Sequence, residues 1–174
     1  MRKIVLYIAM SLDGFICDKD GGVDWLMAFE ASADAYAEFY KTVDTVVMGS
    51  VTYQQIIDEL SPDAWAYKGK TSLVATRQAR EDTADVTFVN DDIVKTVLAL
   101  KNKPGKDIWL VGGAKLVSTF MAAQAIDEYI ISVAPVVLGS GTPLFLPGQA
   151  AQNLMLTAAK QVGGFAELTY TRSK

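Results

Sequence analysis

The chain has 174 residues, 51% of them hydrophobic, which is enough for one domain with a sizeable core. Its formal net charge is −4 and it has no long basic run, so we expect neither a nucleic-acid partner nor a membrane-surface partner. One cysteine, Cys17, and no histidine exclude an intrachain disulfide, histidine-based catalysis and histidine-based metal sites, and we predict no metal centre.

The N-terminus does not fit a secretory signal peptide. Its apolar run over 4–10 is short, lacks a small-residue cleavage site and continues directly into Ser11-Leu12-Asp13-Gly14. No apolar run reaches the roughly 18 residues of a membrane span. We therefore expect a cytoplasmic protein without a membrane segment.

The first part of the chain predicts a buried strand over 3–10, a loop over 14–25 and a helix over about 32–43. A loop of about twelve residues is uncommon in a compact domain, so it is either a functional lid or a solvated surface loop. Residues 32–34, which include Asp34 in the first turn of the helix, could open toward a cleft. An aromatic stripe at helical spacing predicts the inward face of this helix: Tyr36, Phe39, Tyr40 and Val43.

A strand over 45–48 then meets Gly49-Ser50-Val51, and a helix is predicted from Thr52. A glycine between a strand and a helix lets the backbone approach a ligand closely, and the free N–H groups that follow favour an anion. The stretch 52–55 fits a capping box. The core stripe of this helix is predicted to be Tyr53, Ile56, Ile57 and Leu60.

The next strand, over 71–75, ends at Thr76-Arg77. Arg77 either binds a phosphate through both guanidinium nitrogens or is an exposed loop arginine, and the sequence does not separate these readings. A strand over 86–89 leads to a helix opened by Asn90-Asp91-Asp92. The inward residues of that helix are predicted to be Ile93, Val94, Val97 and Leu98.

A second strand–glycine–helix junction follows. The apolar run 108–111 is continuous, as in a strand covered on both faces, and Gly112-Gly113 comes directly after it. A glycine pair alone is as consistent with a tight turn as with a ligand site. Two such junctions in one small domain, however, could hold the two ends of an elongated anion such as a dinucleotide. The inward residues of the helix after this junction are predicted to be Leu116, Val117, Phe120 and Met121.

The last third predicts a long strand over 129–138 interrupted at Pro135, a loop over 139–143, and strands over 154–162 and 165–171 that form a hairpin. About eight strands, with helices between the first six, predict an α/β fold. Its sheet is mostly parallel and mixed, flanked by helices, and carries a C-terminal antiparallel hairpin. We expect residues 1–174 to form a single domain.

Four segments, in order, resemble the dihydrofolate reductase superfamily, in the branch shared with the C-terminal reductase domain of riboflavin biosynthesis proteins (RibD). They are residues 9–16 (AMSLDGFI), 46–53 (VVMGSVTY), 108–114 (IWLVGGA) and 126–145, which runs from IDEY to TPLF. The resemblance implies the three-layer sandwich of that superfamily and NADPH as the hydride donor.

The resemblance also implies which residues hold the cofactor. Ala9 and Ile16 border the nicotinamide. The adenosine and phosphate end is held by Gly49, Ser50, Val51, Thr52, Thr76 and Arg77. The pyrophosphate and the nicotinamide ribose are held by Val111, Gly112, Gly113, Ala114, Lys115 and Leu116. The peptide bond between the two glycines of the second junction is expected to be cis.

Three departures from the superfamily pattern concern phosphate binding and the substrate. Ser50 stands where an arginine is frequent, so phosphate binding falls more heavily on Arg77. Gly112 stands where riboflavin reductases commonly have an acidic residue, and their Asp-Asp-Pro stretch is absent. The carboxylate with which folate reductases protonate the pterin falls near Ala33, with Asp34 as the nearest acid.

These features predict an NADPH-dependent reductase that transfers a hydride to a small heterocyclic substrate. The proton has four candidate sources: Asp13, Asp34, Tyr53 or a bound water. Two alternatives stay open, namely the 5-amino-6-(5-phosphoribosylamino)uracil reductase of riboflavin biosynthesis and a non-catalytic nucleotide-binding protein that keeps the fold. We also expect a two-fold homodimer, because strand 129–138 and the hairpin are too hydrophobic for an uncovered edge and riboflavin-type relatives are commonly dimers.

Overall fold

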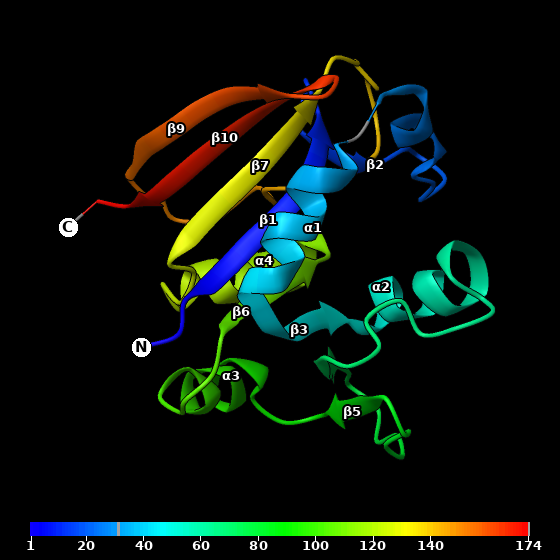
Figure 1. Ribbon diagram of the computed structural model, residues 1–174, viewed down its shortest axis with the longest axis vertical. Helices are drawn as coiled ribbons and strands as arrows, with labels where there is room; N and C mark the ends of the chain where they lie inside the picture. The colour runs from blue at the N-terminus through cyan, green and yellow to red at the C-terminus, as the bar shows by residue number, and fades with distance from the viewer. Residues whose placement is uncertain (31, 174) are drawn as a thin grey trace.

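One eight-stranded sheet with helices on both faces forms the framework of the protein (Figure 1). A computed structural model of the chain describes residues 1–30 and 32–173. The strands of this sheet are β1 (Ile4–Ser11), β3 (Val43–Gly49), β4 (Thr71–Ala75), β5 (Val86–Val89), β6 (Asp107–Gly112), β7 (Glu128–Ala134), β9 (Leu154–Val162) and β10 (Phe165–Arg172). Their order across the sheet is β5-β4-β3-β6-β1-β7-β10-β9. Neighbours from β5 to β7 are parallel, and β10 is antiparallel to both β7 and β9.

The helices lie in two layers, with α1 on one side of the sheet and α4 on the other (Figure 1). The helices of the described residues are α1 (Ala33–Thr42), α2 (Ser50–Gln55), which continues as a π-helical turn over Ile56–Leu60, α3 (Ile93–Lys101), α4 (Ala114–Ala122) and a 3₁₀ helix over Asp24–Ala28. A separate two-stranded ribbon pairs β2 (Phe15–Cys17) with β8 (Thr142–Pro143). Within the described residues, no helix combines the length and hydrophobicity that crossing a bilayer requires.

Two hydrophobic cores form because successive side chains of a strand point to opposite faces of the sheet. Ile108 and Leu110 of β6 lie in the core beneath α3 and α4, where Phe120 is fully buried. Trp109, between them in sequence, lies in the core on the opposite face of the sheet. The centroids of the Trp109 ring and of the Phe39 ring from α1 are 5.3 Å apart. The predicted α/β three-layer architecture, with its mostly parallel sheet and C-terminal hairpin, is confirmed.

The strand predicted over 129–138 is wrong in length and in place. β7 ends at Ala134, because Pro135 has no N–H for the ladder and the Val136 N–H bonds back to the Ala134 carbonyl at 2.8 Å. With seven residues, β7 is shorter than β9, which has nine. It also lies inside the sheet, between β1 and β10, so the exposed edge on this side is β9.

Two connections also differ from prediction. The loop expected over 14–25 contains β2 and the first two residues of the 3₁₀ helix, and the Leu144 N–H donates a hydrogen bond to the Gly14 carbonyl at 2.8 Å. Short strands of this kind leave little periodic signal in the sequence. The helices predicted between each of the first six strands are missing once, since 76–85 joins β4 to β5 without one.

The helix ends are shifted. α1 stops at Thr42, and Val43 begins β3, where its side chain is buried. α2 begins at Ser50 with Gly49 as its N-cap and no side-chain cap, so the capping box predicted from Thr52 is wrong. Leu60, predicted inward, is 49% exposed because the π-helical turn changes which face its last residues occupy.

Two further side chains predicted to point inward lie at the margin of their helices. Tyr36 of α1 is 42% exposed and Leu98 of α3 is 36% exposed. In each helix the buried stripe is narrower than the periodicity suggested, because the sheet covers only one face of a short helix.

Charged groups stabilise the end of the sheet at which the parallel strands begin. Asp127 accepts hydrogen bonds from the Ile4 N–H at 2.8 Å and from the Lys101 ammonium at 2.7 Å, which joins α3 to β1. Arg2, also buried, bonds to Asp44, to the Lys106 carbonyl and to the Thr45 hydroxyl. These contacts lie at the end of the sheet opposite the glycine junctions.

We predict that Asp127→Ala lowers the free energy of unfolding by about 2–4 kcal/mol, because it leaves the largely buried Lys101 ammonium and the Ile4 N–H without their partner. Denaturant unfolding measures this difference. Asp20→Ala is the matched control, since its ion pair with Lys19 is exposed and contributes about 0.5 kcal/mol or less. Equal losses in the two variants would contradict the assignment.

Candidate active site

The residues predicted to hold a cofactor lie at the carboxyl ends of the parallel strands. Gly49 of β3 is in register with Ala75 of β4, and Met48 is in register with Gly112 of β6. The segments 49–52, 76–77 and 112–116 therefore leave the sheet side by side at one edge. In open α/β sheets, ligands bind in the crevice at this edge.

The two glycine junctions touch each other. A Cβ atom built on Gly113 would lie 3.4 Å from Oγ1 of Thr52 and 4.0 Å from Cδ1 of Ile16, and one built on Gly49 would lie 4.0 Å from the Gly112 carbonyl oxygen. A Cβ on Gly112 would approach Cδ1 of Ile8 to 3.3 Å, and the φ of +127° at Gly112 is one that L side chains rarely adopt. The result is a narrow cradle of bare backbone that side chains would fill.

α4 begins directly at this cradle. The peptide bond between Gly112 and Gly113 is cis, as expected. Gly113 is the N-cap of α4 and offers no side chain to its first N–H groups, while the N–H groups of Leu116 and Val117 bond back to the Gly113 carbonyl. The first N–H groups of a helix have no partner within the helix, so those of Ala114 and Lys115 suit a phosphate oxygen.

Arg77 stands at the β4 end of the same edge. The Thr76 N–H bonds to the Val89 carbonyl at 2.9 Å, and Oγ1 of Thr76 accepts from the Gln78 N–H at 3.1 Å, which fixes the turn that carries Arg77. Arg77 is exposed, and in the described part of the chain no ion pair engages it. Arg80, three residues on, lies over the Phe88 ring at 5.5 Å.

The other residues assigned to the cofactor surround this cradle. Ala9 and Ile16 are half-buried, Ala114 and Leu116 are buried, and Lys115 is exposed. Those that remain are half-buried except for Val51, which is 83% exposed: Ser50, Val51, Thr52, Thr76 and Val111. An edge with both bare backbone and exposed side chains could contact a ligand larger than the cradle itself.

The contacts of Asp13 favour a structural role. One of its oxygens accepts from the Ser11 hydroxyl at 2.6 Å, and the other accepts from the Gly139 N–H at 2.7 Å. A third bond comes from the Leu138 N–H at 3.1 Å. The Ser11 bond, helped by the backbone N–H groups, holds the pKa of Asp13 below its usual value. Asp13 thus anchors the loop after β7 as a carboxylate.

The remaining acid–base candidates lie in unlike settings. Asp34 is exposed in the first turn of α1. Tyr53 is only 9% exposed and packs against Trp65 and Phe88, with ring centroids 5.7 Å and 5.2 Å away, which favours a role in the core. Among residues 1–30 and 32–173, no group of three or more Asp, Glu, His or Cys side chains is placed to hold a metal ion.

A groove of about 650 Å³ runs between α1 and the sheet. Phe39 forms part of its α1 wall, and Tyr7, Ile130 and Glu167 form part of its floor, on β1, β7 and β10. Burial raises the pKa of Tyr7, to which the Glu167 charge adds, while a hydrogen bond with Ser132 opposes the shift. Glu167 is not among the site residues predicted from the sequence. The signal that could have found it is its position in the strand: Glu167 stands two residues after Phe165, on the same face. Both residues are buried, while Ala166 between them is exposed.

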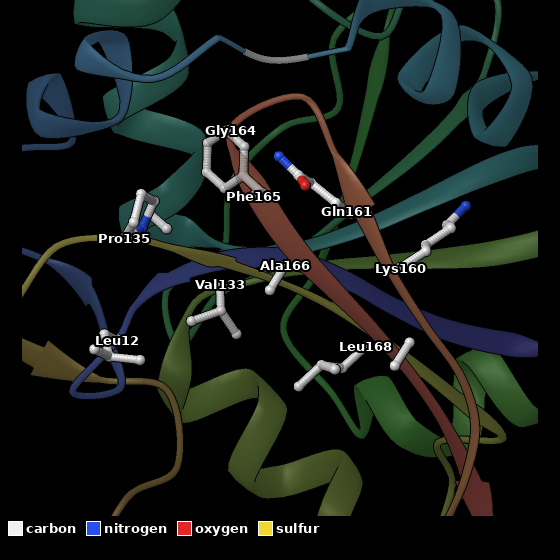
Figure 2. Close-up of a pocket in the computed structure, with 11 residues that line it drawn as sticks. Leu12, Val133, Pro135, Lys160, Gln161, Gly164, Phe165, Ala166 and Leu168 are labelled. Atoms are coloured by element: carbon white, nitrogen blue, oxygen red, sulfur yellow. The ribbon is translucent and has the colours of Figure 1, made fainter.

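A second hollow, of about 570 Å³, lies on the opposite face of the same strands (Figure 2). Its floor is apolar, and Val133, Ala166 and Leu168 lie close together there. Leu156 of β9 pairs with Tyr170 on this face and is 53% exposed.

Comparison with known proteins gives consistent matches. The model of the RibD C-terminal domain family matches residues 2–165. The uncharacterized protein YwjB of Bacillus subtilis (strain 168) is 45% identical over 174 residues, which cover 99% of each chain. The crystal structure of a putative riboflavin biosynthesis protein from Shewanella sp. PV-4 matches with a TM-score of 0.84 and 28% identity over the whole of both chains.

A more distant likeness concerns the fold. Dihydrofolate reductase from Enterococcus faecalis, in complex with NADP(H), matches with a TM-score of 0.66 and 16% identity, over 99% of this chain and 97% of that one. Its strand and helix arrangement is thus shared almost end to end. With the family match covering nearly all of its length and its fold that of dihydrofolate reductase, the chain belongs to the RibD C-terminal domain family.

Proposed function

We propose that the protein is an NADPH-dependent reductase that transfers a hydride to a small heterocyclic substrate. The observation that carries this proposal is the bare-backbone cradle of Gly49, Gly112 and Gly113, next to the uncapped start of α4. Membership of a family named for a riboflavin biosynthesis protein supports it, as does the shared fold of a dihydrofolate reductase that holds NADP(H).

The residues of the carboxyl edge fit such a cofactor. Segment 112–116 would hold the pyrophosphate and nicotinamide ribose, and Ala9 and Ile16 would border the nicotinamide. Segments 49–52 and 76–77 would hold the adenosine phosphates. When bound, NADPH supplies the hydride. The protein's own part is to orient the substrate against that site and to exclude water.

The proton needs a separate source. The contacts of Asp13 and Tyr53 favour structural roles, as described above. We propose that water delivers the proton, with Asp34 as the remaining candidate acid, because it is exposed at the first turn of α1.

The cradle is tested by Gly112→Ala. Its φ of +127° and the contact with Ile8 make the substitution cost about 1–3 kcal/mol of stability. We expect NADPH affinity, followed by tryptophan fluorescence of folded protein, to fall by about tenfold or more, because the new methyl crowds the cradle. Gly69→Ala is the matched control, with a φ of +83° and no atoms near its Cβ position. Normal NADPH binding by Gly112→Ala, or no saturable binding by the wild type, would contradict the proposal.

Cofactor choice is assigned to Arg77. We predict that Arg77→Ala weakens NADPH binding by about tenfold and leaves NADH binding nearly unchanged, because the guanidinium would bind the 2′-phosphate that NADH lacks. Arg80→Ala is the control, since that guanidinium lies over Phe88. If Arg77→Ala weakened the binding of both cofactors equally, Arg77 would have another role.

We further propose that the protein is a homodimer joined through the apolar hollow over β7, β10 and β9. Its apolar residues are Val133, Ala159, Ala166 and Leu168, flanked by Leu12, Pro135 and Phe165. Two such faces related by a two-fold axis would cover each other and the exposed Leu156.

Light scattering at micromolar concentration should give the mass of a dimer. Leu156→Glu should shift it toward the monomer, because a carboxylate would be buried at the joint. Met155→Glu is the matched control. Met155 is 55% exposed, close to the 53% of Leu156, but it pairs with Thr171 on the other face of β9. A monomeric wild type, or equal effects of both substitutions, would exclude this interface.

A further inference from the structure

A cross-strand row connects the expected nicotinamide position to a buried carboxylate. Ala9 of β1 is directly opposite Ser132 of β7, Ser132 is opposite Glu167 of β10, and Glu167 is opposite Lys160 of β9. Directly opposed residues point to the same face of a sheet. With neighbouring strands about 4.8 Å apart, Glu167 stands about 10 Å from Ala9, two strands away on the same face of the sheet.

Glu167 is poorly compensated for a buried charge. Its side chain is 8% exposed, and it forms an ion pair with Lys160 at 3.1 Å, whose own side chain is 58% exposed. The pair engages Oε1, and within residues 1–30 and 32–173 no hydrogen bond reaches Oε2. A buried carboxylate normally has several close partners, as Asp127 has, because removing it from water is costly.

The other acids of the groove are committed elsewhere. At its amino end, Asp107 accepts from the Lys3 N–H at 2.7 Å, and Glu128 pairs with the Lys3 ammonium at 3.4 Å. Glu38 of α1 pairs with Lys41 at 2.6 Å. Glu167 is the most buried of these acids, and it is the one that lies in the same row as Ala9.

Aromatic rings stand beside this carboxylate. The Tyr7 and Phe39 rings, both lining the groove, lie 4.3 Å apart between centroids. The Glu167 charge adds to the raised pKa of Tyr7, which is consistent with both side chains lining the same groove. Aromatic surface next to a carboxylate suits a flat ring whose N–H groups point at the oxygens.

We infer that Glu167 is the substrate-binding carboxylate of this groove, and that the substrate is a planar ring with adjacent N–H donors. The inference rests on the proposed reductase function, because it supplies the acceptor ring for the hydride site at Ala9. Binding of a ring to the groove can nevertheless be measured without cofactor, so the two proposals fail separately. The rival role for Glu167 is a cross-strand ion pair with Lys160 that only stabilises the hairpin.

Two probe molecules of the same shape test the chemistry. In calorimetric titrations of the wild-type protein without cofactor, 2-aminobenzimidazole should bind, because it presents two parallel N–H groups. 2-Methylbenzimidazole, which has a methyl in place of the amino group, should bind about tenfold more weakly or not at all. Equal binding of the two probes, or none of 2-aminobenzimidazole at millimolar concentration, would overturn the inference.

Two matched variants locate the contact. Glu167→Gln keeps the size of the side chain and should weaken 2-aminobenzimidazole binding by about tenfold or more. Glu128→Gln makes the same change in the same groove, at its amino end, and should leave the affinity unchanged. Thermal unfolding checks that both variants are folded. A loss of stability in Glu167→Gln without a loss of probe affinity would show that Glu167 serves only the hairpin.

A further measurement separates this inference from the reductase proposal. NADPH binding by Glu167→Gln should equal that of the wild type, because the cofactor cradle lies at Gly49 and Gly112. Probe binding without any NADPH binding in the wild type would overturn the reductase proposal and keep the groove. NADPH binding with no difference between the probes would keep the reductase proposal and overturn the role of Glu167.

Discussion

The close approach of the β3 and β6 ends is the constraint on which the candidate site depends. Met48 and Gly112 are paired in register, so the chain leaves two adjacent strands within a few atoms of the same point. Any side chain there would meet Thr52, Ile8 or the Gly112 carbonyl. Glycine is the residue that lets both segments turn away and still expose backbone N–H groups at the edge.

The two ends of the parallel strands differ in how their polar groups are paired. At the amino ends of the parallel strands, Arg2 bonds to the Lys106 carbonyl and the Thr45 hydroxyl, and Asp127 accepts from the Ile4 N–H and the Lys101 ammonium. At the carboxyl edge, the start of α4 and the Arg77 side chain keep polar groups without a described protein partner. A fold with one fixed edge can leave the other free for a ligand, since functional sites carry unsatisfied groups that the rest of the structure must tolerate.

Sequence periodicity predicted the parts of the fold that repeat. Apolar runs located the eight strands of the main sheet, the strand–glycine–helix pattern located both glycine junctions, and the family resemblance predicted the cis bond between Gly112 and Gly113. The failures have two causes. β7 stops at a local signal, because Pro135 has no N–H for the ladder, whereas β2 depends on a contact distant in sequence, because it pairs with β8. The groove was missed for the same reason, since Ala9, Ser132 and Glu167 meet only after three strands align.

The C-terminal hairpin carries two different surfaces on its opposite faces, and the registers of β10 and β9 keep them apart. Glu167 and Thr169 face the groove beneath α1, while Ala166 and Leu168 face the apolar hollow. A shift by one residue would exchange the two sets, because successive side chains of a strand alternate between faces. The register of β9 against β10 shifts after Thr169. Because of this shift, Leu156 rather than Thr157 lies opposite Tyr170. The proposed binding in the groove and the proposed association through the hollow thus both require the same strand pairing.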